Sequence, residues 1–251
     1  MAGPLIAKLE QFTKLSSADK SALAHATSLK TRRLQAREDI IRDGDRPQQM
    51  HLILEGWACR YKVLEDGRKQ ITAFLVPGDL CDLRMFILRE MDHSIAALTA
   101  LKLSEIPTDV ILELTDNHSR IARALWWNSL VEEAIAREWT ANVGGRNAFE
   151  RVAHVLCELY LRLEAVGLAN SHGAAGSFEL PVTQEQLADA TGMTSVHANR
   201  TVRQMRDEGL VVWKGKTVTI PNLDALKTAA LFNPNYLHRD RDGRRFDAND
   251  S

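Results

Sequence analysis

Cysteines, long apolar runs and targeting segments are scarce or missing in this chain of 251 residues. The three cysteines, Cys59, Cys81 and Cys157, lie far apart and form no C-x-x-C pair. This spacing supports neither a disulfide framework nor a cysteine metal cluster, so we expect all three to be small buried side chains. No apolar run approaches the roughly 18 to 20 residues of a membrane helix, and the start MAGPLIAKLEQF lacks a signal peptide's apolar segment. We therefore expect a cytoplasmic protein with no membrane partner.

Sequence motifs of catalysis and cofactor binding are also missing. The eight histidines include no pair four residues apart, and the chain has no phosphate-cradling glycine loop and no nucleophile elbow. We therefore expect no enzyme activity, no cofactor and no metal ligand. The formal net charge of −1 argues against a nucleic-acid partner on average, although basic residues can still gather on one face. The length and the 26% of charged residues predict two soluble domains.

The sequence of residues 1–117 predicts a short helix followed by an antiparallel β domain. Ser16 or Ser17 is placed to cap the helix. From residue 33 to 114, short apolar runs alternate with turn sequences such as RDGDRP and VPGD. Asp66–Gly67 lies between two runs rich in β-branched and aromatic residues, which predicts a hairpin. We expect these strands to form a roll or a barrel.

A long helix is expected over residues 118–143. The stretch contains good helix formers without proline or glycine and ends at Gly144–Gly145, where a helix C-cap would lie. Its apolar residues form a stripe whose spacing suits packing along one partner, and three tryptophans broaden it. We expect this stripe to be the seam of a homodimer; the alternative is a helix packed only on its own β domain. The stripe consists of Ile121, Ala124, Leu125, Val131, Ala134 and Ile135, and the tryptophans are Trp126, Trp127 and Trp139.

Residues 144–232 predict a second domain, and a polar tail follows it. The run RNAFERVAHVLCELYLRLEAVG has the spacing of an amphipathic helix. The run LANSHGAAGSFE contains glycine and serine and is expected to be a loop. Residues 233–251 are polar and aperiodic, so we expect them to form a mobile tail.

The second domain contains the pattern of a helix-turn-helix in VTQEQLADATGMTSVHANRTVRQMRDEGL. Thr183 is placed to cap a first helix, with Gln186 at the third position of a capping box. Gly192 interrupts this helix, and Thr194 is placed to cap a second one. Two helices separated by only a few residues predict the DNA-reading arrangement.

The second helix has one face suited to DNA. Its inner face is expected to hold Ala198, Val202 and Met205, and residues 191–206 contain no Asp or Glu. Arginine can pair with guanine and asparagine with adenine in the major groove, while serine and valine offer smaller contacts. The run VVWKGKTVTI predicts a basic hairpin beside it, which completes a winged helix. The residues expected to read bases are Ser195, Val196, Asn199 and Arg200, and those expected to contact phosphates are Thr183, Thr194, His197, Arg203, Lys214 and Lys216.

Residues 12–232 resemble the Crp/Fnr family of bacterial transcription regulators. The matching stretches are LEGWACRYKVLEDGRKQITAFLVPGDL, the long helix, GRNAFERVAHVLCELYLRL and the helix-turn-helix. The resemblance implies an α+β protein with an N-terminal antiparallel β-roll, a long dimerisation helix and a C-terminal winged helix-turn-helix. It implies a homodimer that binds a palindromic double-stranded DNA operator, with half-sites about 10 to 10.5 base pairs apart, and RNA polymerase as a further partner. An effector in the roll would change how the long helices pair.

The chain departs from this family at the effector site. Members that bind cyclic nucleotides hold the ribose with a Glu and the phosphate with an Arg-Ser pair; Leu83 and His93–Ser94 stand at those positions. We therefore do not expect cyclic AMP, and Leu83, His93 and Ser94 mark a candidate pocket for an unidentified effector. No cysteine precedes Cys59, which excludes the N-terminal iron–sulfur cluster of oxygen-sensing members. A haem ligand among His93, Cys81 and His51 is conceivable, but a lone histidine in a β domain is far more often structural, so we assign no haem ligand.

The reading helix departs from the family as well. Ser195–Val196 stands where many members have an Arg and a Glu that accepts from cytosine, whereas Arg200 matches the family's retained arginine. We expect the operator to differ from the usual half-site at the base pair under Val196, toward T·A. The competing hypothesis is a ligand-binding sensor whose winged helix contacts a protein instead of DNA.

Overall fold

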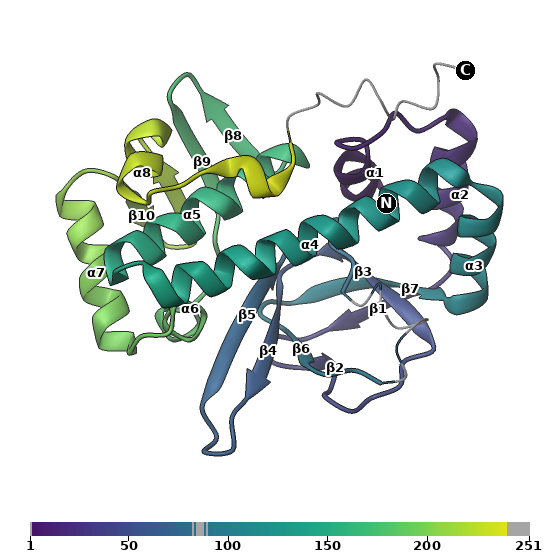
Figure 1. Cartoon of the computed structure of the whole chain (residues 1–251), viewed down its shortest axis with the longest axis horizontal. Coiled ribbons are helices and arrows are strands. Elements are labelled where there is room, and N and C mark those ends of the chain that lie inside the picture. Colours follow the sequence, from purple (N-terminus) through teal and green to yellow (C-terminus); the bar gives the residue numbers. More distant parts are fainter. Residues whose placement is uncertain (1, 82, 84–87, 89, 240–251) are drawn as a thin grey trace. The chain divides into compact units, whose positions relative to one another are not determined.

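The computed structural model describes residues 2–81, 83, 88 and 90–239, and it comprises two compact units (Figure 1). The first unit takes in the chain up to Lys62, Ala73–Ala134 and, among the described residues, 237–239. The second takes in Val63–Thr72 and Ile135–Tyr236. The expected domain limits after residues 117, 143 and 232 stay a prediction.

The first unit is built on strands of two sheets. One sheet has the order β1 (Thr31–Leu34), β7 (Leu101–Pro107), β3 (Gln49–Glu55). The other has the order β2 (Asp39–Ile41), β6 (Ser94–Ala97), β4 (Ala58–Val63), β5 (Lys69–Leu75), the last two being joined by the hairpin at Gly67. The sheets share a core to which each strand contributes at least one apolar side chain. That core includes Leu34, Ile41, Ile53, Ala58, Leu75, Ile95 and Leu103. The predicted antiparallel roll is confirmed.

The N-terminal segment contains two helices rather than one, α1 (Gly3–Leu9) and α2 (Ser17–Ala26). Ser16 is the residue that caps α2: its hydroxyl accepts from Asp19 N at 3.1 Å, and the Asp19 carboxylate accepts from Ser16 N at 2.9 Å. A helix that the sequence did not predict, α3 (Thr108–Asn117), follows β7 within the stretch expected to be strand. These helices pack on the roll through a second apolar cluster that includes Leu5, Leu9, Leu23, Ile111 and Leu114.

The long helix α4 (Ser119–Gly145) extends through the double glycine at which it was expected to end. A glycine ends a helix most effectively by adopting a positive φ, and neither Gly144 nor Gly145 does so. The break comes two residues later because the Asn147 side chain accepts from the backbone N–H groups of Phe149 and Glu150, both at 3.0 Å, and caps α5 (Ala148–Ala165).

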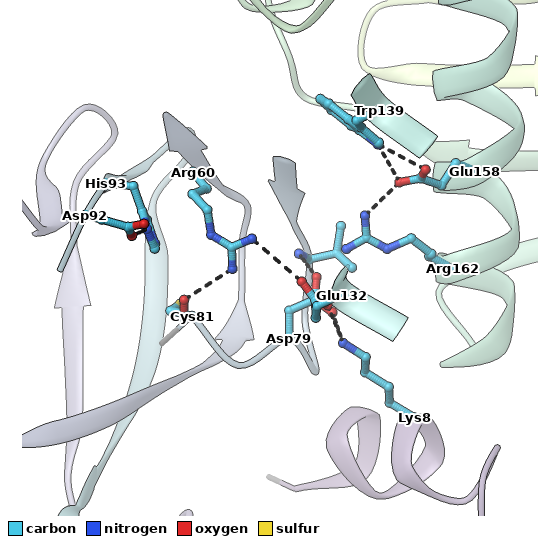
Figure 2. A network of polar contacts seen from close by, with 11 residues as sticks. Lys8, Arg60, Asp79, Cys81, Asp92, His93, Glu132, Trp139, Glu158 and Arg162 are labelled. Carbon is cyan, nitrogen blue, oxygen red and sulfur yellow. Dashed lines mark hydrogen bonds and ion pairs between the residues drawn. The ribbon is translucent and has the colours of Figure 1, made fainter. Parts of the chain in front are cut away.

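The first half of α4 is tied to the roll of its own unit by charge (Figure 2). The Lys8 ammonium lies 2.7 Å from Asp79 and 3.2 Å from Glu132 of α4. Asp79 also accepts from the backbone N–H of Val76 at 2.8 Å. Arg60 of β4 lies 3.8 Å from Glu132, so the acidic side chain on α4 has cationic partners from two elements.

The second unit contains a sheet of order β10 (Val212–Lys214), β11 (Thr217–Ile220), β9 (Ala175–Glu179), β8 (Ala169–His172). Strands β8 and β9 lie in the stretch expected to be a loop, so that expectation was wrong. Close packing requires the glycine at position 176 of β9, because a Cβ there would lie 2.3 Å from the Tyr160 ring of α5. Helices α6 (Gln184–Thr191), α7 (Ser195–Asp207) and α8 (Leu223–Ala229) complete the unit.

The chain after α8 is ordered as far as it is described. A short 3₁₀ helix spans Pro234–Leu237, Leu237 is buried, and the Tyr236 hydroxyl donates to Glu158 at 2.9 Å. The expectation of a mobile tail beginning at residue 233 was therefore wrong for these residues. Residues 240–251 lie outside the described part of the chain. Among the described residues, no helix has both the length and the apolar character needed to cross a membrane.

His154 of α5 provides a test of this packing by pH. Its ring is fully buried against Phe232 and Tyr236, with centroids 5.0 and 5.8 Å away, and its Nε2 lies 3.3 Å from Glu138. Burial, with a smaller effect of the Arg146 charge, lowers the pKa of His154 from 6.5 to about 3. The folded protein therefore holds this ring neutral in the range where the unfolded chain protonates it.

We expect the unfolding free energy contributed by His154 to fall as the pH drops below the unfolded pKa. The unfolded state binds the proton first, so between pH 7 and pH 5 the loss should be about 2 kcal/mol. Chemical unfolding at the two pH values, compared between the natural chain and His154→Gln, measures it. The variant should be less stable at pH 7 but should lose less stability on acidification; equal losses in both proteins would contradict the buried neutral histidine.

Candidate nucleic-acid interface

Two capped helices separated by a short turn form the centre of the site. The Thr183 hydroxyl accepts from Gln186 N at 3.1 Å, and the Gln186 side chain accepts from Thr183 N at 2.8 Å, so the predicted capping box of α6 is confirmed. Thr194 caps α7 in the same way, accepting from His197 N at 3.2 Å. Both caps satisfy N–H groups that would otherwise lack partners at the helix ends.

The turn between α6 and α7 depends on Gly192. Its φ of 64° is left-handed, and a Cβ at this position would lie 3.1 Å from Val143 Cγ1 on the last turns of α4. Arg151 of α5 secures the same turn, because its guanidinium donates to Thr191 O at 3.2 Å and to Arg146 O at 2.8 Å. One side chain thus links the end of α4 to the start of the turn.

Helix α7 has a buried face and an exposed face, as the periodicity predicted. Ala198, Val202 and Met205 are buried, and so is Thr201, which the sequence analysis did not assign to the core. The exposed face carries Ser195, Val196, Asn199, Arg200 and Arg203. Val196 is 82% exposed, an unusual degree of exposure for a β-branched apolar side chain. The apolar contacts of the inner face therefore determine which side chains face solvent.

The electrostatics of this exposed face are one-sided at its N-terminal end. The Arg203 guanidinium lies 3.9 Å from Asp207 one turn on, but both side chains are highly exposed, so solvent weakens the pair. Arg200 lines a groove of about 730 Å³ together with His197, Gln204, Glu208 and the N-terminal turn of α5, which contributes Glu150. The exposed N-terminal half of α7 thus presents cationic and amide groups without a neighbouring carboxylate on the helix itself.

The basic hairpin lies beside these helices in the same unit. Strands β10 and β11 pair antiparallel, and the turn between them contains Gly215 with a φ of 58°. Lys214 and Lys216 are exposed on either side of this turn. The Leu180 backbone N–H donates to Lys216 O at 2.7 Å, which anchors the hairpin to the strand before α6. The predicted winged helix is confirmed as a fold.

The residues of the candidate effector pocket contact different groups. Leu83 packs against the apolar cluster formed by the N-terminal helices. The Ser94 hydroxyl accepts from Asp43 N at 3.0 Å, and His93 Nδ1 lies 2.6 Å from the Asp92 carboxylate. That these three residues share one pocket stays a prediction. The roll interior is occupied by the apolar cluster described above.

In the described part of the chain, the possible metal ligands form no cluster and the thiols are buried. Within residues 2–81, 83, 88 and 90–239, no group of three or more His, Cys, Asp or Glu side chains is arranged to hold a metal ion. All three cysteines are buried thiols, as expected from the sequence. Burial raises the pKa of Cys157 to about 12, so this thiol stays protonated and unreactive.

Sequence reasoning missed the role of Arg151 at this site and the packing of the segment Phe232–Tyr236 on the neighbouring helix α5. Arg151 lies one turn into an amphipathic helix, where an arginine is usually solvated, and only its two carbonyl partners reveal its role. A signal for the segment was present in Tyr236, because an aromatic residue is uncommon in a mobile polar tail.

Comparison with known proteins matches two parts of the chain to two families. Residues 31–118 match the cyclic nucleotide-binding domain family, and residues 150–229 match the Crp-like helix-turn-helix domain family. The transcriptional activator protein FnrL of Cereibacter sphaeroides is 28% identical over 203 residues, 79% of each chain. The nitrogen fixation regulation protein FixK of Bradyrhizobium diazoefficiens is 27% identical over 175 residues, covering 69% of this chain and 70% of that protein. The structure of FixK2 from Bradyrhizobium japonicum has a TM-score of 0.70 at 22% identity, over 80% of this chain and 96% of that one.

The close approach at Gly192 predicts the effect of adding one methyl group. Gly192→Ala should lower the unfolding free energy by about 1 to 2 kcal/mol for the left-handed backbone alone, and further because Val143 must move. Gly173→Ala is the matched control, since Gly173 has a φ of 63° but a Cβ there would have no atom within 4 Å. The difference in unfolding free energy between the two variants, measured in urea, gives the cost of the contact with Val143. A Gly192 variant no less stable than the Gly173 variant would show that the turn does not pack closely against α4.

Proposed function

Because the chain belongs to the Crp/Fnr family of DNA-binding transcription regulators, we propose that it acts as a homodimer that reads a two-fold palindromic operator through α7. The observation that carries this proposal is the exposed face of α7, which lacks acidic residues from its N-cap to Arg206. A helix that only needed to be solvated would mix acids with bases. RNA polymerase is the protein partner that the family implies.

The base-reading role is assigned to the first turns of α7. Arg200 offers two parallel N–H donors for the acceptors of guanine, and Asn199 offers a donor and an acceptor for adenine. Ser195 and Val196 lie nearer the N-terminus and tune the choice of base. These four side chains are exposed in the free protein, so they can reach base edges without unfolding any part of the unit.

The phosphate contacts are assigned to the flanking groups. Thr183 and Thr194 use their hydroxyl oxygens as caps, which leaves each hydroxyl hydrogen able to donate to a phosphate oxygen. His197, Arg203, Lys214 and Lys216 complete the set. The two lysines sit on the hairpin turn, where ammonium groups can approach the backbone without reading sequence.

The dimer seam is reassigned from the stripe expected at first. Ile121, Ala124 and Leu125 pack in the apolar cluster of their own unit, and the other three residues of that stripe are also buried in the single chain. Packing on its own β domain, the alternative for this helix, therefore applies to Ile121, Ala124 and Leu125.

A different face of α4 is exposed and has coiled-coil spacing. Its residues recur at alternating intervals of four and three, the pattern that keeps one face along a supercoiled partner. Trp126 and Leu130, 69% and 49% exposed, are the large apolar members. The full stripe is Ser119, Arg123, Trp126, Leu130, Glu133, Arg137, Thr140 and Gly144. We assign the two-fold contact to this stripe.

No effector is assigned. The two polar anchors of a cyclic nucleotide are replaced by Leu83 and His93, so the proposal does not include cyclic AMP. Leu83, His93 and Ser94 stay a candidate region for another small molecule.

Two substitutions separate base reading from phosphate contact. Arg200→Ala should weaken binding to the selected operator by about 1 to 3 kcal/mol and relax the preference at one base pair. Lys216→Ala should weaken all sequences alike and reduce the salt slope by about one unit. Titrations with operator and scrambled duplexes at several salt concentrations measure both effects. If both variants lost affinity without any change in base preference, the assigned roles would be wrong. If the natural chain bound duplex DNA without dependence on salt, a protein partner for the winged helix would be favoured.

The dimer seam is tested by introducing a charge. Leu130→Glu should raise the dimer dissociation constant by about 100-fold or more, because two carboxylates would be buried without partners. Leu112→Glu is the matched control, as Leu112 on α3 is 46% exposed and lies outside the stripe. Sedimentation velocity over a concentration series gives both constants. An unaltered dimer in Leu130→Glu would place the seam elsewhere.

A further inference from the structure

We propose that Tyr236 is a positioning residue for DNA reading: acting through Glu158, it fixes the second half of α4 against α5 and so sets the spacing of the two reading helices in a dimer. This inference rests on the proposed function and adds to it a role for the segment after α8. That segment has no place in the helix-turn-helix itself.

Glu158 is the centre of the contact. It lies on α5 with no exposed surface. Its carboxylate accepts hydrogen bonds from three side chains, one each on α4, on α5 and in the C-terminal segment. Trp139 Nε1 of α4 donates at 3.0 and 3.1 Å, and Arg162 Nη1 of α5 donates at 3.1 Å, as Figure 2 shows. The Tyr236 hydroxyl donates at 2.9 Å from the C-terminal segment.

A carboxylate without solvent depends on each of these donors. Burial of an ionised group costs several kcal/mol unless hydrogen bonds and an opposite charge replace its water. Arg162 supplies the charge, but only Trp139 and Tyr236 come from outside α5. The two aromatic side chains therefore share one acceptor, and α4 is connected to the C-terminal segment through it.

The segment is also held by contacts that do not involve Glu158. Its backbone turns at Leu231, which has a φ of 49°, and Leu231 O accepts from Arg146 at 3.4 Å. Arg146 in turn lies 2.7 Å from Glu138 of α4. The rings of Phe232 and Tyr236 both pack on His154. Residues Phe232–Tyr236, which we call the strap, thus contact α5 and the region just after α4.

The last turns of α4 lie against the turn of the helix-turn-helix. Val143 would meet a Cβ at Gly192, and Arg151 joins Arg146 O to Thr191 O. A change in the angle between α4 and α5 must therefore move the start of α7. Since α4 also carries the proposed dimer seam, that angle determines the distance between the two copies of α7, and half-site spacing on DNA follows from it.

The first test measures the strap in the free protein. Tyr236→Phe keeps the ring and removes only the hydroxyl, a stop codon after Leu231 removes the strap, and a stop codon after Arg239 is the control. Hydrogen exchange should become at least about threefold faster in peptides from residues 135–145 in the first two proteins, because a buried hydrogen bond to Glu158 is lost. Peptides from α3 and all peptides of the control should be unchanged. Unaltered exchange at residues 135–145 in Tyr236→Phe would overturn the strap.

The second test measures positioning on DNA. Operators with the half-site spacing changed by one base pair in either direction are titrated with the natural full-length chain and with Tyr236→Phe. The natural chain should discriminate against the altered spacings, and Tyr236→Phe should lose about three- to tenfold of that discrimination. An equal loss of affinity at every spacing would show a purely stabilising residue and overturn the positioning role, as would a natural chain without spacing preference.

The outcomes separate this proposal from the proposed function. A natural chain that does not bind duplex DNA overturns the function while the exchange result still reports on the strap. A natural chain that binds with a spacing preference that Tyr236→Phe retains overturns only the positioning role. If the chain that stops after Leu231 does not fold, Tyr236→Phe decides alone, because it leaves the rings packed on His154.

Discussion

The rotation of α7 about its own axis is the constraint from which the rest of the site follows. Ala198, Val202 and Met205 lie on one side of this helix and have no room to leave the core, since they are almost fully buried. Turning the helix by one residue, about 100°, would expose them and bury polar groups such as Asn199 in their place. The core therefore fixes the reading face, and substitutions on that face can change specificity without changing the fold.

Helix α4 is held by charged groups in each unit separately. In the first unit Glu132 accepts from Lys8 and lies near Arg60, and in the second unit Trp139 donates to a carboxylate (Figure 2). Such contacts have a directional geometry that apolar packing lacks, so they oppose rotation of the helix as well as its separation. A stripe of coiled-coil spacing requires this control, because its face must be presented to the partner at one angle.

The sequence predicted the helix-turn-helix well because several local signals agree there. Caps at Thr183 and Thr194, a left-handed glycine and a regular apolar period all indicate the same two helices. Strands β8 and β9 were missed since ANSH has no apolar alternation and Gly176 is needed for Tyr160, a contact between distant residues. The apolar stripe of α4 shows a similar limit: an apolar face in a sequence shows that something covers it, not whether the cover belongs to the same chain.

Val196 shows how an apparent flaw of the free protein can serve recognition. A valine in the first turn of a helix loses rotamer freedom, and at 82% exposure it gains almost nothing from burial. Against a thymine methyl group the same side chain would leave water, and full burial of a valine is worth about 1.5 to 3 kcal/mol. The neighbouring Ser195 cannot supply this term, and a glutamate at position 196 would instead accept from cytosine. The energetic cost of this exposed valine is therefore recovered only on a partner with an apolar group at that place, which favours T·A under Val196.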